Sequence, residues 1–262
     1  MKCYHVDAFS KDIFKGNPAI VCMLNQWLRD DVMQKIAIEH NLSETAFVIP
    51  EGKDYGLRWF TPGGEIDLCG HATLAAAYVL KQFIKPEENR FFFHTMKNDL
   101  AVTCHKNMFS MEFPAYDIYP VAVTPIMKEA IGIQPVAAYM GRDLVCVLPD
   151  ETDVCNAVPN QQMIRQLDGL LLHITAKGKQ YDCVSRSFGP KLDVPEDPVC
   201  GSGHCHLIPL WADLLRKKKI HAYQASKRGG ELYCELQENT VILSGYACLY
   251  SKNEIQVSNE EM

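Results

Sequence analysis

Hydrophobic positions recur along the chain in short alternating or continuous runs, which is the pattern of β-strands. Gly, Pro, Asp and Asn residues separate the runs and predict turns between them. One amphipathic helix is expected over residues 28–40, because its apolar side chains recur on a single stripe. The expected strands cover residues 3–6, 19–24, 45–49, 57–60, 90–94, 108–113, 137–139, 144–148, 170–174, 181–184 and 241–245.

Two further helices are predicted over residues 73–80 and 206–215, and both are apolar on every side. A helix of this kind must be surrounded by protein. With so many strands available, the arrangement that covers both helices is a curved sheet wrapped around one central helix in each half of the chain. Pro209 is expected in the first turns of the second helix, where a proline can kink it.

A repeated motif precedes both apolar helices and indicates an internal duplication. The first copy is Arg58-Trp-Phe-Thr-Pro62 followed by Asp67-Leu-Cys-Gly-His-Ala-Thr73. The second copy is Arg186-Ser-Phe-Gly-Pro190 followed by Asp197-Pro-Val-Cys-Gly-Ser-Gly203. At 262 residues the chain is also longer than one typical domain of about 100 to 200 residues. We therefore predict two similar lobes, residues 1–116 and 117–262, with the extreme C-terminus able to pack on the first lobe.

Composition narrows the class of protein. Hydrophobic residues make up 47% of the chain and charged residues 22%, which suits a folded globular protein. The net charge of −6 argues against nucleic acid and anionic membranes as partners. No N-terminal segment has the pattern of a signal peptide, and no apolar stretch is long enough to span a bilayer. Eleven cysteines without an export signal predict reduced thiols in a cytoplasmic protein.

The Cys-Gly steps of the repeat fall where the two apolar helices are expected to begin. The first amide hydrogens of a helix have no partner within it, and the helix dipole favours an anion there. Gly70, Gly201 and Gly203 would let a ligand approach the backbone, so two such helix ends in a cleft between the lobes would suit a small carboxylate. The simpler interpretation is that these glycines only make strand-to-helix turns.

Cys69 and Cys200 occupy equivalent places in the two copies of the motif. A helix N-terminus is expected to lower the pKa of a thiol placed there, which would make the pair reactive. The alternative for each is inert packing as a small buried side chain.

Four polar residues complete the predicted site. Glu44 follows the amphipathic helix and begins an apolar strand, so its carboxyl is expected to be partly desolvated and suited to proton transfer. The plainer interpretation is an exposed acid at a strand edge. His71 can donate a hydrogen bond to a substrate, and Asp197 can accept one or orient an amine. Ser202 matches His71 in the repeat and is expected either to cap the helix or to bind substrate.

The sequence predicts no metal site, no nucleotide-binding site and no serine-hydrolase site. Cys200, His204, Cys205 and His206 suggest a zinc site, but their spacing matches no familiar closed site, so we expect no metal. The chain lacks GxGxxG, GxxxxGK[ST] and GxSxG motifs, which removes the usual support for nucleotide binding and serine hydrolysis. Proton movement on a small molecule, without a cofactor, is the chemistry that remains.

Six segments, in order along most of the chain, carry a resemblance to the PhzF family, which is named for a phenazine-biosynthesis isomerase. The resemblance implies an α+β, diaminopimelate epimerase-like fold with two pseudo-symmetric lobes, each a curved mixed β-sheet around a central apolar helix, and often a homodimer. The segments are Val6-Asp-Ala-Phe9, Gly16-Asn-Pro18, Leu42-Ser-Glu-Thr-Ala-Phe-Val48, Arg58-Trp-Phe-Thr-Pro62, Leu68-Cys-Gly-His-Ala-Thr73 and Glu196-Asp-Pro-Val-Cys-Gly-Ser202.

The resemblance also implies roles for individual residues. The acid/base glutamate of the family falls on Glu44, its substrate-contacting histidine on His71, and its aspartate and serine on Asp197 and Ser202. In the phenazine enzyme the glutamate shuttles a proton during isomerisation of a dihydro-hydroxyanthranilate. We therefore expect a cofactor-independent isomerase of a small carboxylate, with Glu44, His71 and Asp197 catalytic. The residues expected to bind the substrate are Cys69, Gly70, Cys200, Gly201, Ser202 and Gly203.

Two alternatives stay open from the sequence. The phenazine enzyme is not a two-thiol catalyst, whereas Cys69 and Cys200 resemble the paired acid and base of diaminopimelate epimerase and proline racemase. This similarity favours a racemase or epimerase of an amino or hydroxy acid. The other alternative is a small-molecule binding protein that kept the cleft and lost the reaction.

Overall fold

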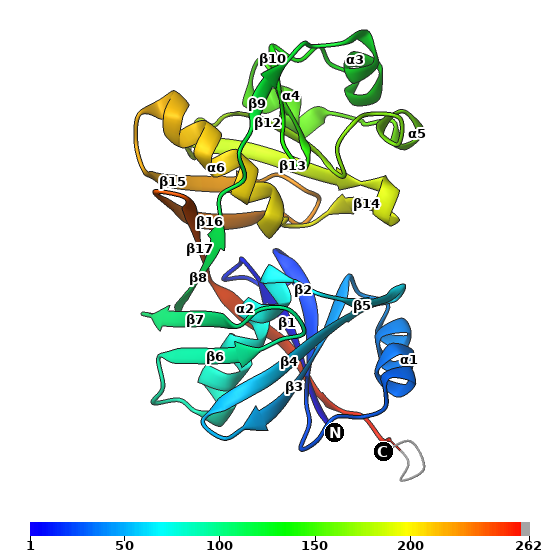
Figure 1. Ribbon diagram of the computed structural model, residues 1–262, viewed down its shortest axis with the longest axis vertical. Helices are drawn as coiled ribbons and strands as arrows, with labels where there is room; N and C mark the ends of the chain where they lie inside the picture. Colours follow the sequence, from blue (N-terminus) through cyan, green and yellow to red (C-terminus); the bar gives the residue numbers. More distant parts are fainter. Residues whose placement is uncertain (258–262) are drawn as a thin grey trace. The chain divides into compact units, whose positions relative to one another are not determined.

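The computed structural model describes residues 1–257, which form two compact units (Figure 1). Unit 1 contains Met1–Met111 and the C-terminal segment that begins at Ser244. Unit 2 is the single stretch Glu112–Leu243. The sequence predicted a division after residue 116, with the extreme C-terminus able to pack on the first lobe. In the structure the division falls after Met111, and the segment from Ser244 belongs to unit 1.

Unit 1 contains a mixed sheet in the order β18–β1–β2–β3–β4–β6–β7–β8. The pairs β2–β3 and β4–β6 are parallel, the other neighbours are antiparallel, and β5 forms a hairpin with β4. The strands are β1 (Lys2–Ala8), β2 (Asn17–Met23), β3 (Glu44–Glu51), β4 (Asp54–Thr61), β5 (Gly64–Ile66), β6 (Arg90–His94), β7 (Leu100–His105), β8 (Met108–Pro114) and β18 (Ala247–Glu254).

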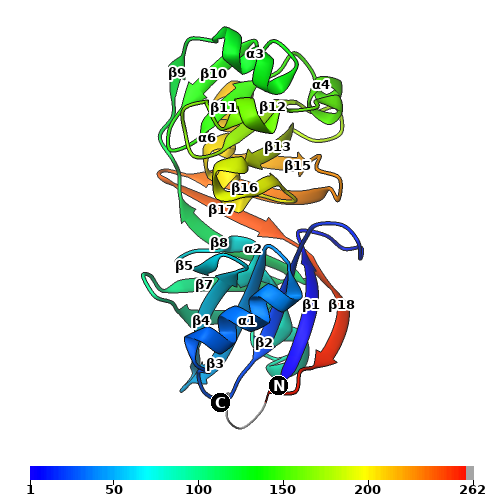
Figure 2. The same cartoon turned by 90° about the vertical axis from the view of Figure 1, so that its right-hand side faces the viewer.

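Two helices of unit 1 pack on this sheet in different ways. Helix α2 (Gly70–Val79), which continues into a π-helical turn (Leu80–Ile84), contacts β1, β2, β3, β7 and β18 and is buried along most of its length. The predicted apolar helix covered by strands is therefore present. Helix α1 (Asp30–His40) packs on β3 and β4 and lies on the outside of the strands (Figure 2).

Unit 2 repeats this plan with the strand order β9–β10–β11–β12–β13–β15–β16. The pairs β11–β12 and β13–β15 are parallel, and β14 pairs with β13. The strands are β9 (Tyr119–Val121), β10 (Ala137–Met140), β11 (Leu144–Val147), β12 (Leu172–Lys177), β13 (Cys183–Gly189), β14 (Val194–Asp197), β15 (Lys219–Gln224), β16 (Gly230–Gln237) and β17 (Thr240–Gly245). The helices are α3 (Pro125–Ile131), α4 (Glu151–Asn156), α5 (Gln161–Ile164), the 3-10 turn η2 (Pro190–Leu192) and α6 (Gly201–Leu215).

Helix α6 is the counterpart of α2 and packs against β15 and β16. Pro209 is its ninth residue, so it lies in the helix interior and not in the first turns. Because proline has no amide hydrogen, the carbonyl of Cys205 one turn earlier lacks its normal helical partner. The amide of Tyr116 donates to that carbonyl at 3.0 Å instead. The proline thus opens a docking point for the segment that enters unit 2.

The two units share one topology, which supports the internal duplication read from the sequence. In unit 1 the antiparallel pair β1–β2 is followed by α1, by β3 parallel to β2, by the hairpin β3–β4, by the buried helix α2 and by β6 parallel to β4. In unit 2 the antiparallel pair β10–β11 is followed in the same way by α4 and α5, by β12 parallel to β11, by the hairpin β12–β13, by α6 and by β15 parallel to β13. The repeated arginines also match: Arg58 forms a bidentate pair with Glu65 at 2.6 Å for both bonds, and Arg186 forms one with Glu196 at 2.7 and 2.9 Å. These arginines join a strand to its hairpin partner, so their role is structural.

Within the described residues 1–257, helices are too short or too polar to cross a membrane. All eleven cysteines are free thiols, and most of them are buried.

Candidate functional site

Three predicted residues of unit 1 lie together at the start of α2. Glu44 is the first residue of β3, Cys69 caps α2, and His71 is the second residue of that helix. The His71 Nε2 atom lies 3.1 Å from Glu44 Oε2, and His71 Nδ1 lies 3.5 Å from Cys69 Sγ. The imidazole therefore stands between a carboxylate and a thiol.

This cluster is buried but not internally satisfied. The side chains of Glu44 and His71 are 16% and 8% exposed. Glu44 Oε2 and His71 Nε2 approach to 3.1 Å as an ion pair, but they are not aligned as a hydrogen bond, and both buried atoms lack a hydrogen-bond partner. An unsatisfied buried polar group costs about 1–3 kcal/mol. Such a pair is suited to a ligand that supplies the missing hydrogen bonds.

Burial and neighbouring groups shift the pKa values of both His71 and Cys69. Burial disfavours a charged His71, but its contact with the Cys69 sulfur and the negative charge of Glu44 raise the pKa of His71 well above its ordinary value. Burial, together with the charge of Glu44, raises the pKa of Cys69. The group therefore favours a protonated His71 next to a neutral thiol.

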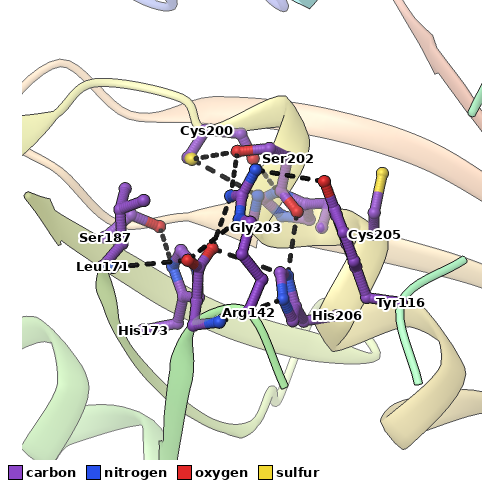
Figure 3. A network of polar contacts seen from close by, with 12 residues as sticks. Tyr116, Arg142, Leu171, His173, Ser187, Cys200, Ser202, Gly203, Cys205 and His206 are labelled. Carbon is purple, nitrogen blue, oxygen red and sulfur yellow. Dashed lines mark hydrogen bonds and ion pairs between the residues drawn. The ribbon is translucent and has the colours of Figure 1, made fainter. Parts of the chain in front are cut away.

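The corresponding start of α6 in unit 2 is capped by Cys200, whose Sγ accepts a hydrogen bond from the Gly203 amide at 3.3 Å (Figure 3). Ser202 is the second residue of the helix, so the expectation that it caps the helix is wrong. Burial raises the pKa of Cys200 well above its ordinary value. The expectation that a helix N-terminus lowers the pKa of both cysteines is therefore also wrong, because desolvation of the thiolate outweighs the helix dipole at these two positions.

Arg142, which sequence reasoning missed, holds the start of α6 (Figure 3). Its neighbour Asp143 was also missed. Arg142 Nη2 donates to Ser202 Oγ at 3.0 Å, and the guanidinium also binds the Asp143 carboxylate through Nε and Nη2 at 3.0 and 2.6 Å. Asp143 is fully buried and lies 3.1 Å from His173 Nε2, while His173 Nδ1 lies 2.9 Å from Ser187 Oγ. Burial opposes ionisation of Asp143, but its hydrogen bonds with His173 and Arg142 hold its pKa far below its ordinary value.

Gly201 and Gly203, the predicted glycines of unit 2, differ in the space that is available for a side chain. A Cβ atom on Gly203 would lie 2.7 Å from His173 Cε1, so a side chain there would clash with a buried ring. A Cβ atom on Gly201 would lie 3.8 Å from Leu243 Cδ1, which is an ordinary contact. Packing therefore explains Gly203 but leaves Gly201 unexplained. Gly70 is the first residue of α2 and is half-buried.

Asp197 ends β14 just before α6 and is half-buried. Its Oδ1 atom accepts a hydrogen bond from the Val199 amide at 3.1 Å. Gln224, a buried residue that the sequence did not single out, fixes the same loop: its Nε2 donates to the Asp197 carbonyl at 2.6 Å and its Oε1 accepts from the Cys200 amide at 2.9 Å. These bonds set the direction in which α6 begins.

The suggested zinc ligands are engaged with separate backbone groups. His204 Nδ1 lies 2.7 Å from the Cys200 carbonyl, and His206 Nδ1 lies 3.1 Å from the Ser202 carbonyl. The Asp143 amide donates to His206 Nε2 at 3.3 Å, which fixes a neutral imidazole with its proton on Nδ1. Burial lowers the pKa of both histidines to about 4. That no metal binds to these residues stays a prediction.

The duplicated topology, with one buried helix in each unit, defines the class of protein. It is the α+β, diaminopimelate epimerase-like fold. A crystal structure of a probable proline racemase from Agrobacterium radiobacter shares this fold: its TM-score is 0.63 over 98% of this chain and 93% of that chain, at 9% sequence identity.

Within this fold the chain belongs to the PhzF family. The family model described as "Phenazine biosynthesis-like protein" matches residues 6–253. A crystal structure of a PhzF family protein from Enterococcus faecalis is 47% identical, with a TM-score of 0.96 over 98% of this chain and 99% of that chain. A protein of Pseudomonas aeruginosa named an uncharacterised isomerase is 42% identical over 259 residues, which cover 98% of this chain and 99% of the relative.

Proposed function

We propose that this protein is a cofactor-independent isomerase that moves a proton on a small carboxylate, with Glu44 as the general acid/base. Membership of the PhzF family and the relative named as an isomerase support the reaction class. The observation that carries the mechanism is the buried pair of Glu44 Oε2 and His71 Nε2, 3.1 Å apart and without an aligned hydrogen bond. A substrate bound against Glu44 and His71 would supply the hydrogen bonds that both side chains lack.

The proposed reaction uses the opposite properties of the two side chains. The Glu44 carboxylate removes a proton from a carbon atom of the substrate and returns it to another carbon, so the net result is isomerisation. Protonated His71 donates a hydrogen bond to the substrate atom on which negative charge develops. Its raised pKa keeps that proton in place near neutral pH.

The proposed contacts of unit 2 lie at the start of α6. Ser202 Oγ, held by Arg142, and the backbone at Gly201 and Gly203 are the candidates for binding a carboxylate. Asp197 is the candidate for orienting a substrate amine. That the starts of α2 and α6 share one substrate in a cleft between the lobes stays a prediction. A crystal structure with a bound carboxylate tests it directly.

The mechanism is tested by replacing Glu44 with glutamine. A panel of small amino, hydroxy and cyclic unsaturated carboxylates, including dihydro-hydroxyanthranilate, is incubated with the protein in deuterated water, and mass spectrometry detects isomerised or deuterated product. Glu44→Gln is expected to lower the rate by about 10² to 10⁴-fold, the usual contribution of one acid/base group. Glu51→Gln at the other, exposed end of β3 is the matched control and should keep full activity.

The outcomes separate the hypotheses. Full activity of a folded Glu44→Gln protein would exclude the mechanism. Binding of a carboxylate without turnover or isotope exchange, across the whole panel, would favour the non-catalytic binding protein.

A two-thiol racemase or epimerase is the second candidate, because Cys69 and Cys200 cap the two equivalent helices. Their raised pKa values weigh against it, since the thiolate is the form that removes a proton. This candidate predicts that Cys69→Ser and Cys200→Ser each stop α-hydrogen exchange of the substrate. Exchange retained in both variants would exclude it.

The homodimer and the cytoplasmic location also stay predictions. Light scattering on the purified protein during gel filtration tests the first, and microscopy of a tagged chain tests the second.

A further inference from the structure

A second cluster of reactive side chains lies in unit 1, away from Glu44 and His71. Cys3 of β1 and Cys22 of β2 are directly opposite each other across an antiparallel strand pair, and their sulfur atoms are 3.1 Å apart. His40 is the last residue of α1. One donor atom from each of these three residues lies within 4.8 Å of the other two. Strand register and the end of a helix thus bring two thiols and an imidazole together.

The cluster is buried in apolar surroundings. Cys3 and Cys22 are 1% and 0% exposed and belong to a hydrophobic cluster that includes Leu24 and Met33. The Nε2 atom of His40 is buried and has no hydrogen-bond partner. A buried ring nitrogen without a partner costs free energy, so it calls for an explanation. One ring nitrogen of His40 lies within 4.8 Å of both sulfur atoms.

A thiolate, and not a thiol, is the form that binds a metal ion.

We propose that Cys3, Cys22 and His40 form a binding site for one soft metal ion, and that the ion is Cu(I). Two sulfur atoms and one imidazole are soft or borderline donors, which select Cu(I) or Zn(II) over oxygen-seeking cations. Within the described residues, the cluster contains three His, Cys, Asp or Glu donors and not four. Structural Zn(II) is almost always four-coordinate, whereas three donors in a dry pocket suit Cu(I).

A disulfide is the alternative chemistry for two sulfur atoms this close. It would require them to approach from 3.1 Å to about 2.05 Å and would leave the His40 nitrogen unpartnered. A metal ion would bind both sulfurs and satisfy that nitrogen as well. Binding displaces thiol protons to solvent and changes no oxidation state, so no oxidant is needed.

The test is a Cu(I) titration of the whole protein, reduced and kept anaerobic, against the chromophoric chelator bicinchoninate. Wild type should bind one equivalent that Cys22→Ser lacks. His40→Gln, a change at the half-buried end of α1, should weaken this equivalent by more than tenfold, since even outer-shell changes cost about 10- to 100-fold in metal affinity. Cys104→Ser removes another buried thiol of the same unit and is the matched control, which should bind like wild type. X-ray absorption of the loaded protein should show two sulfur neighbours and one nitrogen neighbour.

Each other result would overturn the proposal. Equal Cu(I) affinity of wild type and a folded His40→Gln variant would show that the imidazole is not a ligand. The same loss in Cys104→Ser as in Cys22→Ser would show only general binding to thiols. A Cys3–Cys22 disulfide in protein isolated without reductant, with no Cu(I) equivalent after reduction, would assign the pair to disulfide chemistry.

Discussion

At His71, burial and neighbouring charge act on one imidazole in opposite directions. Burial alone would favour the neutral ring, as it does at His204 and His206, where the pKa falls to about 4. At His71 the contact with the Cys69 sulfur and the charge of Glu44 reverse the outcome. Buried histidines therefore differ in protonation according to the groups beside them: His71 lies 3.1 Å from the Glu44 carboxylate, whereas His204 Nδ1 lies beside a backbone carbonyl.

This difference predicts a pH dependence of stability. The pKa of His71 in the folded state is raised above its unfolded value of about 6.5, so its contribution to stability is fully present below about pH 6.5 and is lost as pH rises through the folded pKa. Replacing His71 with glutamine removes this contribution. Urea unfolding at about pH 6 and about pH 9 should show a larger loss of unfolding free energy for wild type than for His71→Gln. Parallel losses in the two proteins would contradict the assignment.

Asp143 is expected to be the most costly single charge to remove from unit 2. It is fully buried, and Arg142 and His173 both depend on it as a partner. Asp143→Asn should lower the unfolding free energy by about 3 kcal/mol, the low end of the range for a broken buried pair, because Arg142 is 34% exposed and can still reach water. Asp213→Asn, which breaks an exposed pair with Arg216, should cost about 0–1 kcal/mol. Equal effects of the two changes on unfolding in urea would refute this ranking.

At the scale of the element, the first turn of α6 is shaped by its packing on β12. Gly203→Ala places a methyl group 2.7 Å from His173 and should cost about 1–3 kcal/mol, as overpacking does in a dense core. Gly201→Ala would make only an ordinary contact, 3.8 Å from Leu243 Cδ1, and should be neutral or stabilise the helix by about 0.5–1 kcal/mol. Thermal unfolding of the two variants separates them. A Gly203→Ala protein as stable as Gly201→Ala would show that the helix start moves freely.

The sequence pattern predicted the helices and the repeat better than it predicted the contacts and burial of individual side chains. The apolar helices and the repeat follow from the residues themselves, because a helix such as α2 has no polar face to expose. The Arg142–Asp143 pair could not be found in this way, since between Gly141 and an apolar run it looks like any polar turn. Its role depends on β12 and α6 bringing His173 and Ser202 to it. The thiol pKa prediction failed for a related reason, because local sequence shows the helix start but not how deeply it is buried.

At the scale of the whole molecule, unit 1 is built from both ends of the chain. Strand β18 pairs along its length with β1, from Lys2 opposite Glu254 to Ala8 opposite Ala247. The sequence predicted two similar lobes and allowed the extreme C-terminus to pack on the first. It did not identify β1 as the pairing partner, because the exposed, partly polar residues of β18 do not specify which strand they pair with.

Truncation tests this dependence of unit 1 on its last strand. A chain ending at residue 245 lacks β18, so amides of unit 1 should lose protection from hydrogen exchange while those of β12 and β13 in unit 2 keep it. A chain ending at residue 257 keeps β18 and is the control. Equal loss of protection in both units would show that they unfold as one body.

The return of β18 to β1 also sets an order of events for a chain leaving the ribosome. Glu112–Leu243 is one continuous stretch, so every partner it needs has been synthesised before the last strand emerges. Strand β1 can pair with β2 early, but its other edge stays unpaired until residues 247–254 have been synthesised. Unit 2 is therefore expected to fold first on the nascent chain, although it is encoded second, and exposed β1 is the surface that chaperones would have to protect in the interval.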